Sequence, residues 1–259
     1  MFTSNPFAEL SAYIASGVAQ TYVVVMFILV VAGTLIDVIH KKSAKYFFED
    51  WQKSKSKGSK QVGSGEIVSM AVQTLASEVL TSSEFCAARR RIAHLLTMYG
   101  FVAYVVATAI MVFGYPTSAS PTPVIWPVLW HIGALMVCVG GYWFWFFIRV
   151  DVAAEGNSPF RIMRADLFIL SLLASTTLAL AWSWLQTSIA GWLVFGLYVL
   201  ATTVLFGSIP WSKFAHMFFK PSAALQNRVA EASGSRSNLP APADKPETFG
   251  KAPGLPENY

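Results

Sequence analysis

Long apolar runs alternate with polar segments along most of the chain. Five of the runs have about 20 residues each, which is the length that a helix needs to cross the roughly 30 Å hydrocarbon core of a bilayer. This pattern predicts an all-α integral membrane protein, built as a five-transmembrane-helix bundle. The predicted spans are about Ala19–Ile39, Ile92–Gly114, Val124–Ile148, Leu167–Leu185 and Ile189–Ile209.

Composition supports a membrane protein and excludes other classes. Of the 259 residues, 54% are apolar or aromatic and only 13% are charged, whereas a soluble domain has about 25% charged residues. The mean hydropathy of +0.50 argues against a single soluble globule, and the high apolar content excludes disorder over most of the length. Two cysteines do not make a disulfide scaffold.

The positive charges predict the orientation of the chain. Of the 19 Lys and Arg residues, ten lie between the first and second spans, three between the third and fourth, and six after the fifth. Because positive residues collect on the cytoplasmic side, we expect the N-terminus outside and the C-terminus in the cytoplasm. The net charge of +5 is then an orientation signal, and we expect no nucleic-acid partner.

The spans divide the chain into four parts. We expect residues 1–42 to form an N-terminal segment with the first span, and residues 43–91 to form a basic cytoplasmic loop. Within that loop, residues 53–65 look flexible, and the apolar spacing from Ile67 to Leu80 predicts an amphipathic helix on the membrane, on a partner or on the bundle. Residues 92–221 form a four-helix membrane core, and residues 222–259 a disordered cytoplasmic tail.

Two histidines are the leading candidates for binding chemistry. His94 follows Arg91 by three residues at the inner end of the second span, and His216 lies at the inner end of the fifth. Two imidazoles on separate helices can hold a haem iron. Arg91 and Lys213 lie at the same height and could bind its propionates. The alternative is that both histidines simply reach interfacial water.

Four segments resemble the gamma subunit of respiratory nitrate reductase and its relatives in sulfur metabolism. They are RIAHLLTMYGF (91–101), HIGALMVCVGG (131–141), RADLFILSLL (164–173) and, most specifically, IPWSKFAHMFFKP (209–221). The resemblance covers roughly residues 88–221. It implies a five-span subunit of the bacterial inner membrane that binds b-type haem and exchanges electrons with quinones. It also implies that His94 and His216 are the ligands of the haem nearer the cytoplasm.

The resemblance does not extend to a second haem. In the family, the ligands of the outer haem lie ten residues after the position of His94 and eighteen residues before the position of His216. In this sequence those two positions hold Tyr104 and Tyr198. A neutral tyrosine does not replace imidazole in such a site. We therefore expect one b-type haem or none.

Within that group, the sequence looks most like the membrane anchors associated with adenylylsulfate reductase in sulfur-oxidising bacteria. This narrower resemblance rests on the opening NPFAELSAYI, the single long basic loop and the missing outer histidine pair. It implies a cytoplasmic flavin and iron–sulfur oxidoreductase as partner and a quinone as diffusible electron carrier. No phosphate loop, nucleophile elbow or metal-type cysteine spacing appears, so we expect no catalytic residue in the chain itself. The rival hypothesis is a haem-free anchor that only docks the soluble enzyme.

Other polar or small residues leave two interpretations open. Asp37 with His40, and separately His131, could contact a quinone or could be interfacial side chains. Gly133 and Gly140 share a helix face and could admit either a porphyrin or a neighbouring helix, of which the helix is the more frequent cause.

Overall fold

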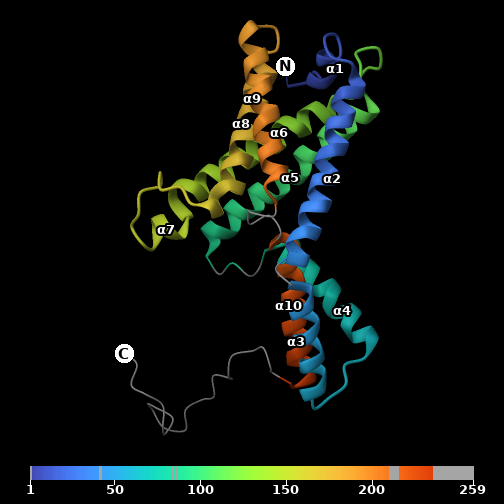
Figure 1. The fold of residues 1–259 in the computed structure, drawn as a ribbon, viewed down its shortest axis with the longest axis vertical. Coiled ribbons are helices and arrows are strands. Elements are labelled where there is room, and N and C mark those ends of the chain that lie inside the picture. Colours follow the sequence, from blue (N-terminus) through green and yellow to red (C-terminus); the bar gives the residue numbers. More distant parts are fainter. Residues whose placement is uncertain (1, 41–42, 83–84, 86, 210–215, 236–259) are drawn as a thin grey trace.

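The computed structural model describes residues 2–40, 43–82, 85, 87–209 and 216–235. Every regular element in these residues is a helix (Figure 1). The helices form two groups along the long axis of the molecule. A bundle of long helices occupies one part, and a smaller cluster of shorter helices occupies the other (Figure 1).

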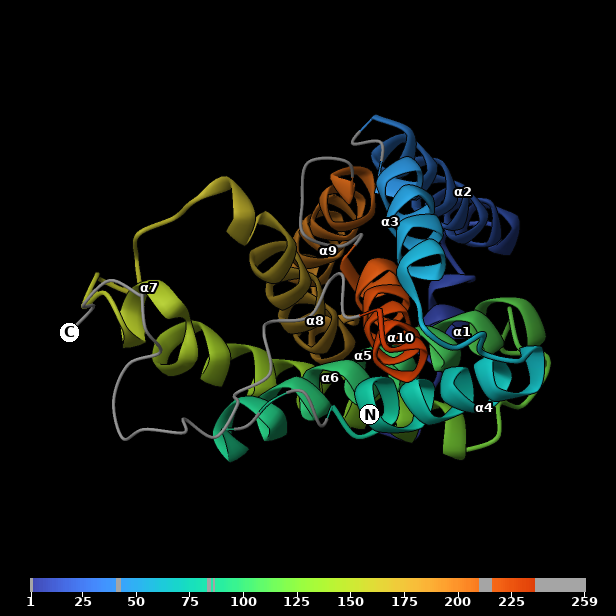
Figure 2. The same ribbon diagram turned by 90° about the horizontal axis from the view of Figure 1, so that it is seen from below.

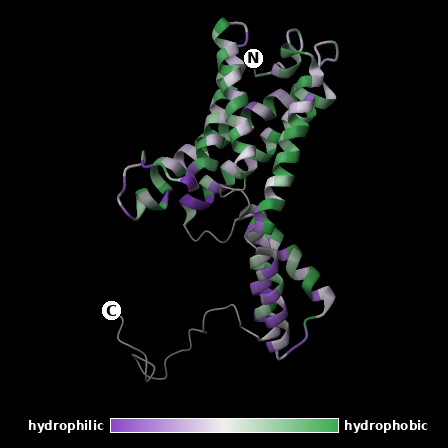
Figure 3. Cartoon of the chain, in the orientation of Figure 1, coloured by the Kyte–Doolittle hydropathy of each residue, from purple (hydrophilic) through white to green (hydrophobic). Residues whose placement is uncertain are grey.

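Five helices are long and apolar enough to cross a membrane, which indicates a multi-pass membrane protein and confirms the five predicted spans. They are α2 (Ser16–His40), α5 (Ala88–Gly114), α6 (Ile125–Trp143) with its π-helical continuation η2 (Phe144–Ile148), α8 (Leu167–Leu185) and α9 (Ile189–Gly207). Colouring by hydropathy shows the same division, because the bundle is mostly apolar and the smaller cluster is more polar (Figure 3).

Glycines allow α5 and α6 to lie unusually close together. A Cβ atom added to Gly133 would come within 2.7 Å of the Gly100 carbonyl oxygen and of the Tyr104 amide nitrogen. A Cβ added to Gly140 would come within 2.7 Å of the Ala93 carbonyl oxygen. The shared glycine face of α6 is therefore occupied by α5, which favours helix packing over a porphyrin there.

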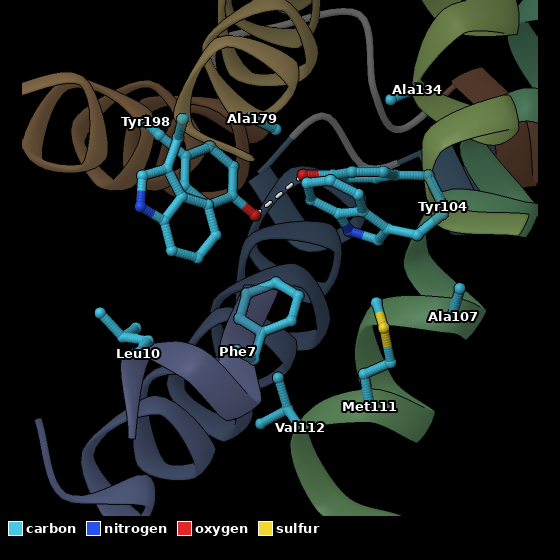
Figure 4. Packing of buried hydrophobic residues seen from close by; sticks show 11 residues of the cluster. Phe7, Leu10, Tyr104, Ala107, Met111, Val112, Ala134, Ala179 and Tyr198 are labelled. Atoms are coloured by element: carbon cyan, nitrogen blue, oxygen red, sulfur yellow. Dashed lines mark hydrogen bonds between the residues drawn. The ribbon is translucent and has the colours of Figure 1, made fainter. Parts of the chain in front are cut away.

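A short helix, α1 (Pro6–Leu10), closes one end of the bundle, which we call the α1 end (Figure 1). Asn5 caps it, because its side-chain oxygen accepts hydrogen bonds from the amides of Phe7 and Ala8, while its Nδ2 donates to the Tyr115 carbonyl oxygen. Phe7 packs between Trp130 and Trp182, at centroid distances of 5.9 and 5.6 Å. The apolar core of the bundle thus continues into the N-terminal segment (Figure 4).

The smaller cluster lies at the opposite end, which we call the α10 end. It contains α3 (Ser43–Lys57), α4 (Ser64–Thr74), the π-helical turn η1 (Leu75–Leu80) and α10 (His216–Ser233). Seen from that end, α10 lies between α3 and α4 (Figure 2). Arg228 joins α10 to η1 by bonds to Ser77 Oγ (2.7 Å) and Glu78 Oε1 (3.2 Å). The amide of Ser59, after α3, donates to the Ser233 carbonyl oxygen at 2.9 Å.

The connection between α6 and α8 contains α7 (Val150–Ala153) and a 3-10 turn, η3 (Arg164–Asp166). A buried ion pair holds it, with Arg149 Nη1 2.9 Å from Asp166 Oδ2. The Arg149 guanidinium also lies 4.1 Å from the centre of the Trp145 ring. This connection is therefore fixed to the end of α6.

Two polar segments in which the sequence predicted no regular structure are helical in part. α3 continues through residues 53–57 and is reinforced by the Lys45–Glu49 pair one turn apart. Alanines, Leu225 and Val229 continue α10 through residues 222–233, and Val229 and Ala230 are buried within the cluster. The remainder of the expected tail, residues 236–259, lies outside the described residues.

The predicted amphipathic helix is present as α4 and η1. Its apolar positions do not all point one way. Thr74 is buried and Ile67 half-buried, whereas Val68, Val72 and Leu75 are exposed. Since α4 packs on α10, the smaller cluster is its neighbour in the described chain.

Candidate functional site

His94 lies near the start of α5 and is held by a serine from the preceding segment. Its Nδ1 atom is 3.0 Å from the Ser82 Oγ atom. Ser82 is fully buried and has a φ of 49°, in the left-handed region that L-residues seldom adopt. The Phe85 ring covers His94 at a centroid distance of 5.0 Å. His94 is thus a half-buried, oriented imidazole with an aromatic neighbour.

Three side chains of α5 fasten the segment that delivers Ser82. Arg91 Nε donates to the Thr81 carbonyl oxygen at 2.7 Å, and Tyr99 OH donates to the Leu80 carbonyl oxygen at 2.6 Å. With the Ser82–His94 bond, these contacts hold residues 80–82 against α5. The wide turn of η1 and the positive φ of Ser82 bring the chain into that position.

His216 lies beyond the last span, at the start of a separate helix. The last span ends at Gly207 and His216 is the first residue of α10. The side chain of His216 and all of Lys213 lie outside the described residues.

The first turns of α10 nevertheless come close to His94. Lys220, one turn after His216 on α10, places its Nζ atom 5.2 Å from the centre of the Phe85 ring. The same ring covers His94. The start of α10 and the start of α5 therefore share a neighbour.

Of the predicted site residues, the structure places Arg91 and His94 together, with Arg91 engaged by the Thr81 carbonyl oxygen. Sequence reasoning missed Ser82, Phe85 and Tyr99. No sequence signal distinguishes Ser82 from the other serines of the loop, because its role depends on an unusual backbone conformation.

A tyrosine pair lies in the middle of the bundle. Tyr104 OH donates to Tyr198 OH at 2.8 Å, and both residues are buried (Figure 4). Trp130 stacks on Tyr104 at 5.3 Å and Trp182 stacks on Tyr198 at 5.8 Å. The positions that the resemblance assigns to outer haem ligands thus hold a direct hydrogen bond between two phenols.

His131 is buried within the bundle. Its Nδ1 lies 2.7 Å from the Pro127 carbonyl oxygen and its Nε2 lies 2.8 Å from Ser183 Oγ. Both ring nitrogens therefore bond to the chain itself. Asp37 is buried and His40 is exposed, so the two differ in environment although both lie at the end of α2.

The model of one protein family, described as citrate utilization protein B, matches residues 15–237. This range contains all five membrane-spanning helices and every described residue of the smaller cluster. No curated protein and no solved structure matches the chain.

Proposed function

The chain belongs to the citrate utilization protein B family, and we propose that it serves as a membrane anchor and electron-transfer subunit. In this role it links a cytoplasmic oxidoreductase to the quinone pool of a bacterial inner membrane. The α10 end faces the cytoplasm and the α1 end faces outward. The distribution of all 19 Lys and Arg residues supports this orientation.

The arrangement at His94 carries the proposal. An imidazole that ligates a metal through one nitrogen commonly donates its other N–H to an oxygen atom, which fixes its tautomer. The Ser82 Oγ atom, 3.0 Å from Nδ1, is such an oxygen. With Nδ1 donating, Nε2 would be the atom offered to a metal. His94 would therefore hold a b-type haem through Nε2, and His216 is the proposed second residue that would hold it.

The surrounding residues suit the rest of a haem. The Phe85 ring offers an apolar contact beside His94. Arg91 uses Nε for the Thr81 carbonyl oxygen, and its guanidinium has further donors for a propionate. Lys213 is the second proposed propionate partner. When bound, the haem supplies one-electron transfer, while the chain binds it, orients it and holds it near the cytoplasmic surface.

The proposed partner is a flavin and iron–sulfur enzyme. The resemblance of residues 88–221 favours adenylylsulfate reductase. Oxidation of one sulfite as it joins AMP would release two electrons, which together with two protons from water would reduce one quinone to a quinol. The name of the family concerns citrate utilization instead, so the choice of enzyme rests on that resemblance. Arg89 and Arg90 are exposed at the α10 end, and they are candidates for contact with an acidic enzyme surface.

A reduced-minus-oxidised absorption spectrum tests the haem. The full chain, expressed with sufficient haem and purified in detergent, is expected to give a b-type α-band. His94→Ala and His216→Ala should abolish the band, while His40→Ala, at an exposed position of α2, should retain it. Ser82→Ala should weaken haem binding by about 10- to 100-fold. A folded, haem-supplied protein without the band would overturn the proposal.

A haem-free anchor is the second candidate, and one observation favours it. Ser82 gives His94 a polar partner within the chain, so the imidazole has a structural role without iron. Binding of purified adenylylsulfate reductase to nanodiscs that contain the full chain separates the candidates. Equal binding by wild type and His94→Ala, together with no α-band in either, supports the haem-free anchor.

A further inference from the structure

An elongated cavity of about 380 Å³ lies between α2 and the rest of the bundle. Its walls come from α2 on one side and from α5, α8 and α9 on the other, and Phe7 and Leu10 of α1 line the α1 end. The residues that line it on α2 run from Val18 to Val30. Val30 lies twelve positions after Val18, which corresponds to about 18 Å of helix, so the cavity is long enough for an extended apolar chain.

The cavity walls are mostly apolar, and the hydroxyls that line them belong to Tyr22, Tyr104, Thr108, Ser175, Tyr198 and Thr202. Four of these form two pairs, because the Tyr104 and Tyr198 hydroxyls bond each other at 2.8 Å and the hydroxyls of Ser175 and Thr202 bond each other at 2.8 Å. All four residues line the cavity. Tyr104 and Tyr198 lie near the middle of their helices, at the depth where polar groups are costly and are often functional.

The direction of the hydrogen bond leaves the Tyr198 proton available for donation. Tyr104 donates to the Tyr198 oxygen, so the Tyr198 hydroxyl can donate its own proton either to the neighbouring Thr202 hydroxyl or to an acceptor in the cavity. Phe101 and Phe195 also line the cavity, and the centre of the Phe195 ring is 6.4 Å from that of Tyr198. A planar ring that carries a carbonyl oxygen matches both features, whereas a lipid acyl chain matches only the apolar length.

We propose that this cavity binds a lipophilic quinone. The head group lies beside Tyr104 and Tyr198, its carbonyl oxygen accepts a hydrogen bond from Tyr198, and its tail follows α2. The choice of a quinone rests on the proposed function, but the cavity does not involve the haem. Ten residues of α5 separate Tyr104 from His94, about 15 Å along the helix, so the two sites are distinct.

Tryptophan fluorescence gives a direct test of binding. Trp130 and Trp182 stack on the two tyrosines, and quinones quench tryptophan emission at contact. The full chain in phosphatidylcholine nanodiscs without native quinone is titrated with decylubiquinone. We expect a saturable quenching component in addition to the linear quenching caused by partition into the lipid.

Matched variants locate the site. Tyr198→Phe should weaken the saturable component about five- to tenfold, the value of one hydrogen bond, whereas Tyr142→Phe, whose hydroxyl bonds Thr177 outside the cavity, should not. Val23→Phe should fill the cavity and abolish the component. Val24→Phe, at an exposed neighbouring position, should retain it. Circular dichroism and thermal unfolding verify that each variant is folded.

Three outcomes overturn the proposal. They are quenching that never saturates, saturable quenching that Val23→Phe leaves unchanged, and displacement of the quinone by an equal concentration of a simple alkane of similar length. The last result identifies an acyl-chain site. Repeating the titration with His94→Ala separates the two proposals, because loss of haem should leave quinone binding unchanged.

Discussion

At the scale of single residues, glycines on α5 and α6 position the candidate site as much as its polar side chains do. Gly100 and Gly133 let the backbones of α5 and α6 meet. This close contact sets where α5 places His94 and Tyr104, because both lie on that helix. A packed interior deforms little when a group is added. The spacing of Gly133 and Gly140 predicted a close neighbour, but the sequence could not say that the neighbour is α5.

Gly133→Ala tests this packing. The new Cβ would lie 2.7 Å from two backbone atoms of α5, so the helices must separate, and we expect a loss of stability of about 1–3 kcal/mol. Thermal unfolding in detergent measures the effect. Gly196→Ala on α9, where a Cβ meets nothing within 4 Å, should be neutral or stabilising by up to about 1 kcal/mol. Equal behaviour of the two variants would contradict the importance of the contact.

At the scale of elements, the spans were predictable and their polar partners were not. Twenty apolar residues have few alternatives to a membrane helix, so hydropathy alone located α2, α5, α6, α8 and α9. The extent of α10 could not be predicted in this way. Its residues form no long apolar run, and its position depends on contacts with η1 and with the residues after α3, which are far away in sequence. The Ser82–His94 contact likewise depends on a π-helical turn that no sequence pattern predicts.

Ala230→Asp tests whether α10 is fixed to its neighbours. Ala230 is fully buried, and a buried unpaired carboxylate costs several kcal/mol, so α10 should separate from α3 and α4. The backbone of Lys60 is held by the Ser233 carbonyl oxygen. Trypsin should therefore cleave after Lys60 faster in this variant. Ala223→Asp, at an exposed position of the same helix, is the control, and the same rate in both variants would show that α10 does not protect this loop.

At the scale of the whole molecule, the two ends differ in character. The α1 end is closed by a short capped helix, and the α10 end carries the polar cluster (Figure 3). The positive-inside rule gives this asymmetry a direction, with the α10 end in the cytoplasm. That direction stays a prediction, because a bundle has the same internal contacts in either orientation.

Cysteine labelling of intact cells tests the direction. After Cys86 and Cys138 are replaced by alanine, Ser118→Cys in the loop between α5 and α6 should react with a membrane-impermeant maleimide added outside. Ser69→Cys on α4 should react only after the membrane is permeabilised. Both positions are exposed, so access to the reagent is the variable. The reverse pattern would invert the proposed topology.

The partnership of α3 and α4 with α10 has a consequence for biosynthesis. A ribosome makes α3 and α4 before four of the five spans, but it makes α10 after all of them. Val229 and Ala230, which are buried in the finished cluster, reach it only when the last span has already emerged. A chain that stops early leaves α3 and α4 without this partner. Formation of the cluster therefore marks a chain in which all five spans have been made, and a partner enzyme that recognised the cluster would select such chains over ones that stop before α10.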